Sequence, residues 1–457
     1  MGKRELTIDM IESVTGGRLV GDSALKSRVV RGAVRDNRDV AEGNLFVCFR
    51  GERVDGHDFA NRAFDAGAAC CLAEREIPDA AGPYILVKST AEALKRLGGY
   101  YRSLFDIPVI GVTGSVGKTT AKEMICAVLS ARLNVLKTPE NLNNEIGVPL
   151  TLLSLEDSHE AAVIEMGISE FGEMRRLAEM VRPDICLITK IGHCHLEALG
   201  DLEGVLRAKS EVFELMSADA TAIVNGDDEL LRAADLKIKK LTFGTQPGND
   251  YRAMNIVSAS KSSVSCDLVF PDAKISAEIP AYGSHLVYAA LPAAVIARLL
   301  GLSFDEIRSG IAAFSPVGSR SRIIETGQIT IIDDCYNANP NSVKASILSL
   351  SGLKGRRVAI LGDMKELGWQ ADTLHREVGV CVAESGIDCL ICCGAKAEYI
   401  FKGLKSTGSE IEAYHFPLKD ALLSTLHTIV RPGDSVLVKA SHSMNFDDIT
   451  ETLVKLD

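Results

Sequence analysis

Short apolar runs alternate with helical hydrophobic patterns along most of the chain. The runs that predict buried strands lie at 45–49, 84–87, 107–112, 161–164, 184–189, 222–224, 329–332, 358–361, 389–392 and 435–438. Segments with helical patterns separate them. This alternation predicts an α/β protein whose mostly parallel sheets are covered by helices on both faces.

Breaks in the pattern predict three domains. They are a small α/β domain over 1–88, a central domain over 89–314 and a Rossmann-like domain over 315–457. Within the central domain, Ser89-Thr90 predicts the start of a helix over 91–104. The stretch 250–279 predicts strands with turns at Ser262-Ser263 and Pro271-Asp272, and a helix over 285–300 follows it.

One segment predicts phosphate binding. The segment Thr113-Gly114-Ser115-Val116-Gly117-Lys118-Thr119-Thr120 lies between a buried strand and a helix that begins near Lys118. Glycines let backbone N–H groups converge on phosphate oxygens, and the helix N-terminus adds partial positive charge. Lys118 can reach the β- and γ-phosphates, and the Thr119 hydroxyl can bind Mg²⁺. The segment therefore predicts an ATP site, although Val112 stands where the general loop has glycine.

The loop by itself leaves the class of protein open. Kinases, GTPases and ligases can all carry Gly-Lys-Thr at the start of a helix. The chain lacks the Asn-Lys-x-Asp sequence that recognises guanine, which disfavours GTP.

Composition excludes several classes of protein. The 457 residues carry a formal net charge of −11, so we expect no nucleic-acid partner. No segment reaches the roughly 18 uncharged apolar residues of a membrane helix, and residues 1–9 lack the apolar stretch of a secretory signal. We therefore expect a cytoplasmic protein with no membrane partner.

The 12 cysteines lie mostly in apolar runs, so we expect them to be reduced and buried. Cys389 and Cys392 form a CxxC pair. In a strand, residues three apart face opposite sides, so this pair is not expected to share a metal ion.

Three further positions bear on metal binding. Glu165 follows the run 161–164, and a carboxylate at the carboxyl end of a strand suits Mg²⁺, although a surface acid is the alternative. His193 and His195 would face the same way on a strand, but no further Cys/His cluster at metal-ligand spacing lies nearby. Lys209, taken alone, is typical of a solvated helix lysine.

Several motifs together resemble the Mur ligase family of peptidoglycan synthesis. Besides the phosphate loop, they lie at 141–149, 165–167, 195–200, 208–211, 333–340, 361–368 and 375–379. Tyr336-Asn337-Ala338-Asn339-Pro340 and the Gly-Asp-Met-x-Glu-Leu-Gly at 362–368 are similar to the branch that adds D-Ala-D-Ala. Residues 35–38 and 51–59 resemble the family's uridine-nucleotide domain, so the likeness spans the chain.

The resemblance implies an ADP-forming amide ligase that acts in cytoplasmic peptidoglycan precursor synthesis, and hence in cell shape and division. It implies UDP-N-acetylmuramoyl-tripeptide, D-Ala-D-Ala and ATP as substrates, an acyl-phosphate intermediate, and a monomeric bacterial protein. A related ligase acting on folate is disfavoured, because such enzymes lack the uridine domain.

The resemblance also implies roles for individual residues. The catalytic group is Lys118, Glu165, His195 and Lys209. The Mg²⁺ ligands are Thr119, Glu165, His195 and Lys209, the last as a carbamate. The nucleotide site adds Arg320, Asp334, Asn337 and Asn339 to the phosphate loop. The substrate-binding residues are Asp36, Asn37, Arg38, Asn143, Asn144, Lys439 and Ser441.

The chain departs from the family pattern at several positions. Ala289 stands where an asparagine is credited with recognising adenine, and His442 where an arginine is usual. Ser319 replaces a glycine before Arg320, and Asn37 replaces a serine. These departures motivate a second hypothesis, a catalytically weakened paralogue that binds nucleotide or cell-wall precursor. The intact Lys118, Glu165, His195 and Lys209 favour the ligase.

Overall fold

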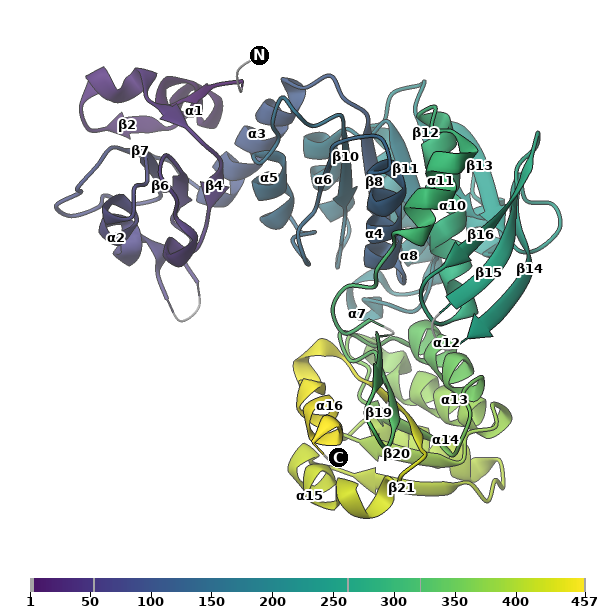
Figure 1. The fold of residues 1–457 in the computed structure, drawn as a ribbon. Coiled ribbons are helices and arrows are strands. Elements are labelled where there is room, and N and C mark those ends of the chain that lie inside the picture. Colours follow the sequence, from purple (N-terminus) through teal and green to yellow (C-terminus); the bar gives the residue numbers. More distant parts are fainter. Residues whose placement is uncertain (1–3, 52–53, 261–262, 321, 456–457) are drawn as a thin grey trace.

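The structure is a computed structural model, and it describes residues 4–51, 54–260, 263–320 and 322–455. Met1–Lys3, Glu52, Arg53 and part of the turn predicted at Ser262-Ser263 lie outside these ranges. Three main sheets, one in each third of the chain, carry the fold (Figure 1).

The first sheet has five strands in the order β2-β7-β6-β5-β4. Its strands are β2 (Arg18–Val20), β4 (Ala33–Val34), β5 (Leu45–Val47), β6 (Cys70–Ala73) and β7 (Tyr84–Leu86). A small antiparallel pair, β1 (Leu6–Thr7) and β3 (Val29–Val30), flanks helix α1 (Ile8–Thr15), and α2 (Ala60–Asp65) precedes β6. Strands β4 to β7 are parallel, as expected for a small α/β domain.

The central sheet has nine strands in the order β16-β15-β14-β13-β12-β11-β8-β10-β9. They are β8 (Val109–Thr113), β9 (Val135–Lys137), β10 (Ala161–Glu165), β11 (Ile185–Ile188), β12 (Thr221–Asn225), β13 (Lys239–Gly244), β14 (Tyr251–Ser260), β15 (Ser263–Val269) and β16 (Lys274–Ile279). The strands from β9 to β14 pair in parallel, and β14, β15 and β16 form an antiparallel meander.

Nine helices accompany this sheet in the described part of the chain. They are α3 (Thr90–Ser103), α4 (Lys118–Leu129), α5 (Gly147–Leu152), α6 (Glu173–Val181), α7 (Leu196–Leu199), α8 (Leu202–Ser210), α9 (Glu229–Ala233), α10 (Val287–Leu299) and α11 (Phe304–Ala312). The Ser89 side chain caps α3, as its sequence predicts. The helix predicted over 285–300 is wrong at its start, because Ser284–Leu286 form a 3₁₀ turn before α10 begins.

The third sheet has six strands in the order β17-β18-β22-β19-β20-β21. They are β17 (Arg322–Glu325), β18 (Thr330–Asp333), β19 (Arg357–Gly362), β20 (Cys389–Cys393), β21 (Glu412–Phe416) and β22 (Ser435–Lys439). Its helices are α12 (Pro340–Ser351), α13 (Ala371–Glu384), α14 (Ala397–Ser406), α15 (Lys419–Ile429) and α16 (Asp447–Val454). Edge strands β17 and β21 are only half-buried or exposed, so neither carries the apolar run that predicts a strand.

The central and third sheets are covered on both faces, as the apolar runs predict. In β10, Ala161 and Val163 face one core, while Ala162 and Ile164 face another. In β20, Cys389 and Cys392 likewise belong to different cores. The CxxC pair is therefore split between opposite faces, which confirms the sequence argument.

The first and third domains lie at different ends of the central domain (Figure 1). The connection between α11 and β17 leads into the third domain, where Asn339 and Asn341 reach back to the phosphate loop and to His193. Within the described residues, no helix is both long and apolar enough to span a membrane.

Two adjacent glycines of α3 give a matched test of packing. A Cβ on Gly98 would lie 2.5 Å from the Cβ of Pro149 in α5, whereas a Cβ on Gly99 would lie 3.4 Å from the nearest atom, the Cα of Met180. Gly98→Ala should lower the free energy of the first unfolding transition by about 1–3 kcal/mol through overpacking. Gly99→Ala should leave it unchanged or raise it by up to about 1 kcal/mol, because alanine favours helices. Denaturant titration followed by circular dichroism measures both variants, and equal effects would contradict the packing argument.

Candidate active site

The phosphate loop joins β8 to α4, as its sequence predicts. Gly114 and Gly117 adopt the positive φ values of 142° and 80° that glycine tolerates best. A Cβ on Gly114 would lie 2.0 Å from Thr189 Oγ1, whose hydroxyl donates to the Val116 carbonyl at 2.6 Å. Lys118 folds back over the loop and donates to the Gly114 carbonyl at 2.7 Å. The loop is therefore shaped by contacts with the segment after β11.

Glu165 ends β10 beside the first turn of α4. It is buried, with its carboxylate accepting hydrogen bonds from Thr119 Oγ1 and Asn143 Nδ2, both at 2.8 Å. Lys122, one turn beyond Lys118, is fully buried and lies 3.8 Å from the same carboxylate. The alternative of an exposed surface acid is therefore wrong, and Glu165 joins the loop helix to the 138–143 segment.

His195 does not lie on a strand, so strand alternation does not set its orientation relative to His193. The chain leaves β11 at Ile188, and His195 precedes α7 with φ of 51°, in the left-handed region. Its Nδ1 lies 2.6 Å from Glu366 Oε2 of the third domain, and this hydrogen bond lowers the pKa of Glu366. A contact between two domains, rather than strand alternation, therefore orients His195.

Lys209 is buried in α8, so the expectation of a solvated lysine is wrong. Its exposed fraction is 1%, and within the described part of the chain its ammonium makes no hydrogen bond or ion pair. Burial is the main cause that lowers the pKa of Lys209 to about 8; the charge of Lys118 acts in the same direction, while Cys194 and Glu173 oppose it. Lys209 thus lies within electrostatic range of the phosphate loop.

The described residues contain no group of three or more His, Cys, Asp or Glu side chains that could hold a metal ion. Glu165 and the Thr119 hydroxyl nevertheless form an adjacent pair of oxygen donors beside the loop, and hard cations such as Mg²⁺ prefer oxygen. A magnesium ligand set at this site would therefore need further oxygen donors, or a modified Lys209.

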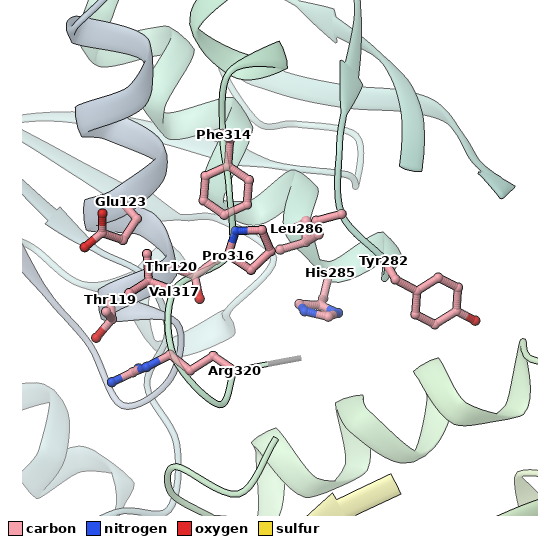
Figure 2. Close-up of a pocket in the computed structure, with 11 residues that line it drawn as sticks. Thr119, Thr120, Glu123, Tyr282, His285, Leu286, Phe314, Pro316, Val317 and Arg320 are labelled. Carbon is pink, nitrogen blue, oxygen red and sulfur yellow. The ribbon is translucent and has the colours of Figure 1, made fainter. Parts of the chain in front are cut away.

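A pocket next to the loop is lined by residues from the central domain and from the connection to the third domain (Figure 2). The lining residues are Thr119, Thr120, Glu123, Ala281, Tyr282, His285, Leu286, Phe314, Pro316, Val317 and Arg320. The guanidinium of Arg320 lies 3.8 Å from the ring centre of Tyr336 and, in Figure 2, extends toward the Thr119 side of the pocket. Withdrawal from water lowers the pKa of His285. The pocket therefore combines apolar side chains with polar ones from the first turns of α4, next to the phosphate loop.

The loop after β18 carries the remaining nucleotide-site candidates. Asp334 is held by Lys439 Nζ at 2.5 Å and by Ser346 Oγ at 2.6 Å. Asn339 caps α12, and its Nδ2 donates to the Ser115 carbonyl at 3.4 Å. Pro340 opens this helix at its first position, where proline is well tolerated.

The substrate-binding candidates lie in all three domains. Asp36 and Arg38 pair within the first domain, where hydrogen bonds from Arg38 lower the pKa of Asp36 to about 2, and Asn37 begins a 3₁₀ turn between them. Asn143 touches Glu165, whereas the Asn144 side chain accepts from Gly147 N at the start of α5. Ser441 accepts from the backbone of Lys365 at 2.9 Å.

Comparison with known proteins identifies the group to which this site belongs. Three sequence families match the chain: the Mur ligase family catalytic domain at 31–102, the Mur ligase middle domain at 112–297, and the Mur ligase glutamate ligase domain at 319–442. The chain belongs to the Mur ligase family. UDP-N-acetylmuramoyl-tripeptide–D-alanyl-D-alanine ligases of Bacillus subtilis and Escherichia coli are each 34% identical to this Mur ligase, over 98% of both chains.

Solved structures agree with this assignment. MurF from Acinetobacter baumannii matches this Mur ligase with a TM-score of 0.90 and 30% identity, over 100% of both chains. MurF from Thermotoga maritima in complex with ADP matches with a TM-score of 0.81 and 29% identity, over 93% of this chain and 98% of that one. The three-domain α/β architecture predicted from sequence is thereby confirmed.

Sequence reasoning missed several residues of the Mur ligase site. Lys122 carries a detectable signal, since it lies one helical turn beyond Lys118 on the same side of α4. Glu366 lies inside a recognised motif, but only the fold brings it to His195. His285 and Leu286 line the pocket, whereas Ala289 packs in a core with the rest of α10. Among residues 283–290, the pocket lining therefore includes His285 and Leu286 but not Ala289.

Removing the loop lysine should weaken nucleotide binding. Lys118→Met should reduce ADP affinity about 10- to 100-fold, the range for losing a charge-assisted hydrogen bond. Lys190→Met is the control, because Lys190 is exposed and only its backbone contacts the loop. Isothermal titration calorimetry measures both variants, and equal affinities would contradict the role of Lys118.

Proposed function

We propose that this protein is an ATP-dependent ligase that joins D-Ala-D-Ala to UDP-N-acetylmuramoyl-tripeptide, acting as a monomer in the cytoplasm on peptidoglycan precursors. The observation that carries the proposal is the buried Lys209 beside the phosphate loop, close to Lys118 and within one chain that also holds Glu165 at a strand end. We propose domain boundaries near residues 88 and 314, because these positions fall between the three sheets.

The proposed chemistry has two steps. A carboxylate oxygen of the tripeptide attacks the γ-phosphorus of ATP, the bond from this phosphorus to its bridging oxygen breaks, and ADP leaves. The amine of the dipeptide then attacks the acyl carbon, inorganic phosphate leaves, and the nitrogen loses a proton. The first step brings two anionic groups together, so the site needs positive charge and aligned donors there. The second step needs the dipeptide amine in its neutral form and donors that stabilise the leaving phosphate.

Residues of the phosphate loop, and of the connection between α11 and β17, would supply that positive charge. Lys118 would leave the Gly114 carbonyl and bind the β- and γ-phosphates, where the N-terminus of α4 adds its dipole. Arg320 would bind phosphate oxygens through its planar fork of donors. Asp334, Asn337 and Asn339 would lie on the nucleotide side, with the base in the apolar pocket of Figure 2.

The Mg²⁺ ligands would be Thr119, Glu165, His195 and a carbamylated Lys209. Bound there, the ion would neutralise the phosphate charge. An unmodified Lys209 repels a cation, and as a buried ammonium without a counter-charge it is unfavourable. Reaction of its neutral amine with CO₂ would form an N–C bond and release one proton, giving a carbamate anion with two oxygen donors, whose charge the bound cation would compensate.

The two substrates would be bound from opposite sides of this centre. The first domain would bind the uridine nucleotide through Asp36, Asn37 and Arg38, and Asn143 and Asn144 would lie along the muramyl peptide. Lys439 and Ser441 of the third domain would face the dipeptide. Lys439 already anchors Asp334, so part of its role is to order the nucleotide loop.

Phosphate release tests the proposed function. With ATP, Mg²⁺, a UDP-N-acetylmuramoyl-tripeptide and D-Ala-D-Ala, we expect stoichiometric phosphate and amide product, and little phosphate when either the tripeptide or the dipeptide is omitted. Tripeptides ending in diaminopimelate and in lysine should both be tried. ATP binding without turnover on any tripeptide would contradict the ligase and favour the precursor-binding paralogue.

Lys209 gives a test that depends on pH. With a pKa of about 8, about one-tenth of the amine is neutral at pH 7 and about nine-tenths at pH 9. At fixed dissolved CO₂, the rate of carbamate formation should therefore rise about tenfold between these pH values, as measured by ¹³C NMR with labelled bicarbonate. Lys209→Ala should lose the signal and at least about 100-fold in kcat, with partial rescue by a short-chain carboxylate. Lys190→Ala should change neither, and full activity of Lys209→Ala without rescue would exclude the carbamate.

A further inference from the structure

The contact between His195, which we propose as a metal ligand, and Glu366 joins the central domain to the third domain. Besides the 2.6 Å contact from Nδ1 to the carboxylate, Leu196 N donates to the Glu366 carbonyl at 3.0 Å. Glu366 has a φ of 62° and His195 a φ of 51°, so both non-glycine residues adopt the left-handed conformation. Such conformations persist where surrounding contacts require them, and here each residue faces the other.

The carboxylate selects one form of the imidazole. An ionised carboxylate only accepts hydrogen bonds, so the neutral ring must carry its proton on Nδ1. The lone pair then lies on Nε2, which makes no hydrogen bond within the described residues. A ring nitrogen in this state is a metal ligand, and a carboxylate on the opposite nitrogen is the partner that orients such ligands.

Glu366 reaches His195 only because the third domain is docked. It lies between β19 and the 3₁₀ turn at Gly368–Gln370, where a Cβ on Gly368 would come within 3.3 Å of the Glu197 Cα. Asn341 Oδ1 accepts from His193 N at 3.4 Å near the same junction. The position of the third domain therefore decides whether His195 has its partner.

We propose that Glu366 is a positioning residue that couples docking of the third domain to the readiness of His195 to bind the divalent cation. The proposal rests on the proposed function for the identity of the site. Glu366 touches neither nucleotide nor peptide in this role. It fixes the ring orientation and the tautomer, so that the metal site is complete only when the domain carrying Glu366 is in place.

Metal binding tests the proposal without turnover. Mn²⁺ affinity in the presence of ADP is measured by electron paramagnetic resonance, and ADP affinity in EDTA by calorimetry. Glu366→Ala should weaken Mn²⁺ binding about 10- to 100-fold, the range for losing the partner of a metal-bound histidine, and leave ADP affinity in EDTA unchanged. Glu366→Gln should lose about 3- to 10-fold, because an amide holds the ring but both donates and accepts, and so does not select the tautomer.

A matched control lies on α13. Glu377 is half-exposed and pairs with Lys344 on the same domain, so Glu377→Ala should bind Mn²⁺ like the parent protein. Far-ultraviolet circular dichroism and thermal unfolding of each variant report whether it keeps the fold of the parent protein. Unchanged Mn²⁺ affinity in Glu366→Ala, or an equal loss in Glu377→Ala, would overturn the proposal.

The ligase assay is a separate readout. If Mn²⁺ affinity falls in the order parent protein, Glu366→Gln, Glu366→Ala, but the parent protein forms no amide, the proposed function fails and the positioning role stands. If it forms amide but Glu366→Ala binds Mn²⁺ like the parent, the positioning role fails alone.

Discussion

The parallel register of β8 and β10 is the constraint on which the site depends. In that register Glu165 lies opposite Val112, so the carboxylate at the end of β10 reaches the first turn of α4. The resulting hydrogen bond from Thr119 to Glu165 joins the helix that follows the phosphate loop to the neighbouring strand. A one-residue slip would turn Glu165 to the other face of the sheet and leave the loop without its acidic partner.

Buried charge is distributed unevenly around the carboxyl ends of β8 and β10. Lys122 is compensated by Glu123, by Glu165 and by the carbonyls of Thr138 and Glu140. Lys209 is almost as deeply buried, but within the described residues its ammonium makes no comparable ion pair or hydrogen bond. The two lysines therefore differ in their surroundings: Lys122 is held by close partners, whereas Lys209 is the one for which we propose a chemical role.

Local pattern predicted most of the fold and part of the site. The phosphate loop, the strand that ends at Glu165 and the cap at Ser89 follow from neighbouring residues, so sequence suffices for them. The orientation of His195 depends on Glu366, 171 positions away, and the burial of Lys209 depends on how α8 packs. The edge strands β17 and β21 escaped notice because an exposed edge needs no apolar run. Long-range contacts of this kind leave no periodic signal in the chain.

Asn339 has a consequence for the electric field at the loop. Its side chain caps α12 while its Nδ2 contacts Ser115, so the positive end of the α12 dipole is held next to the loop that already begins α4. Two helix N-termini, one from each domain, thus converge on one spot. Because the second N-terminus is carried by a separate domain, the positive potential at the loop depends on where that domain lies. An anion at the loop would experience a weaker field from α12 if the third domain lay further away.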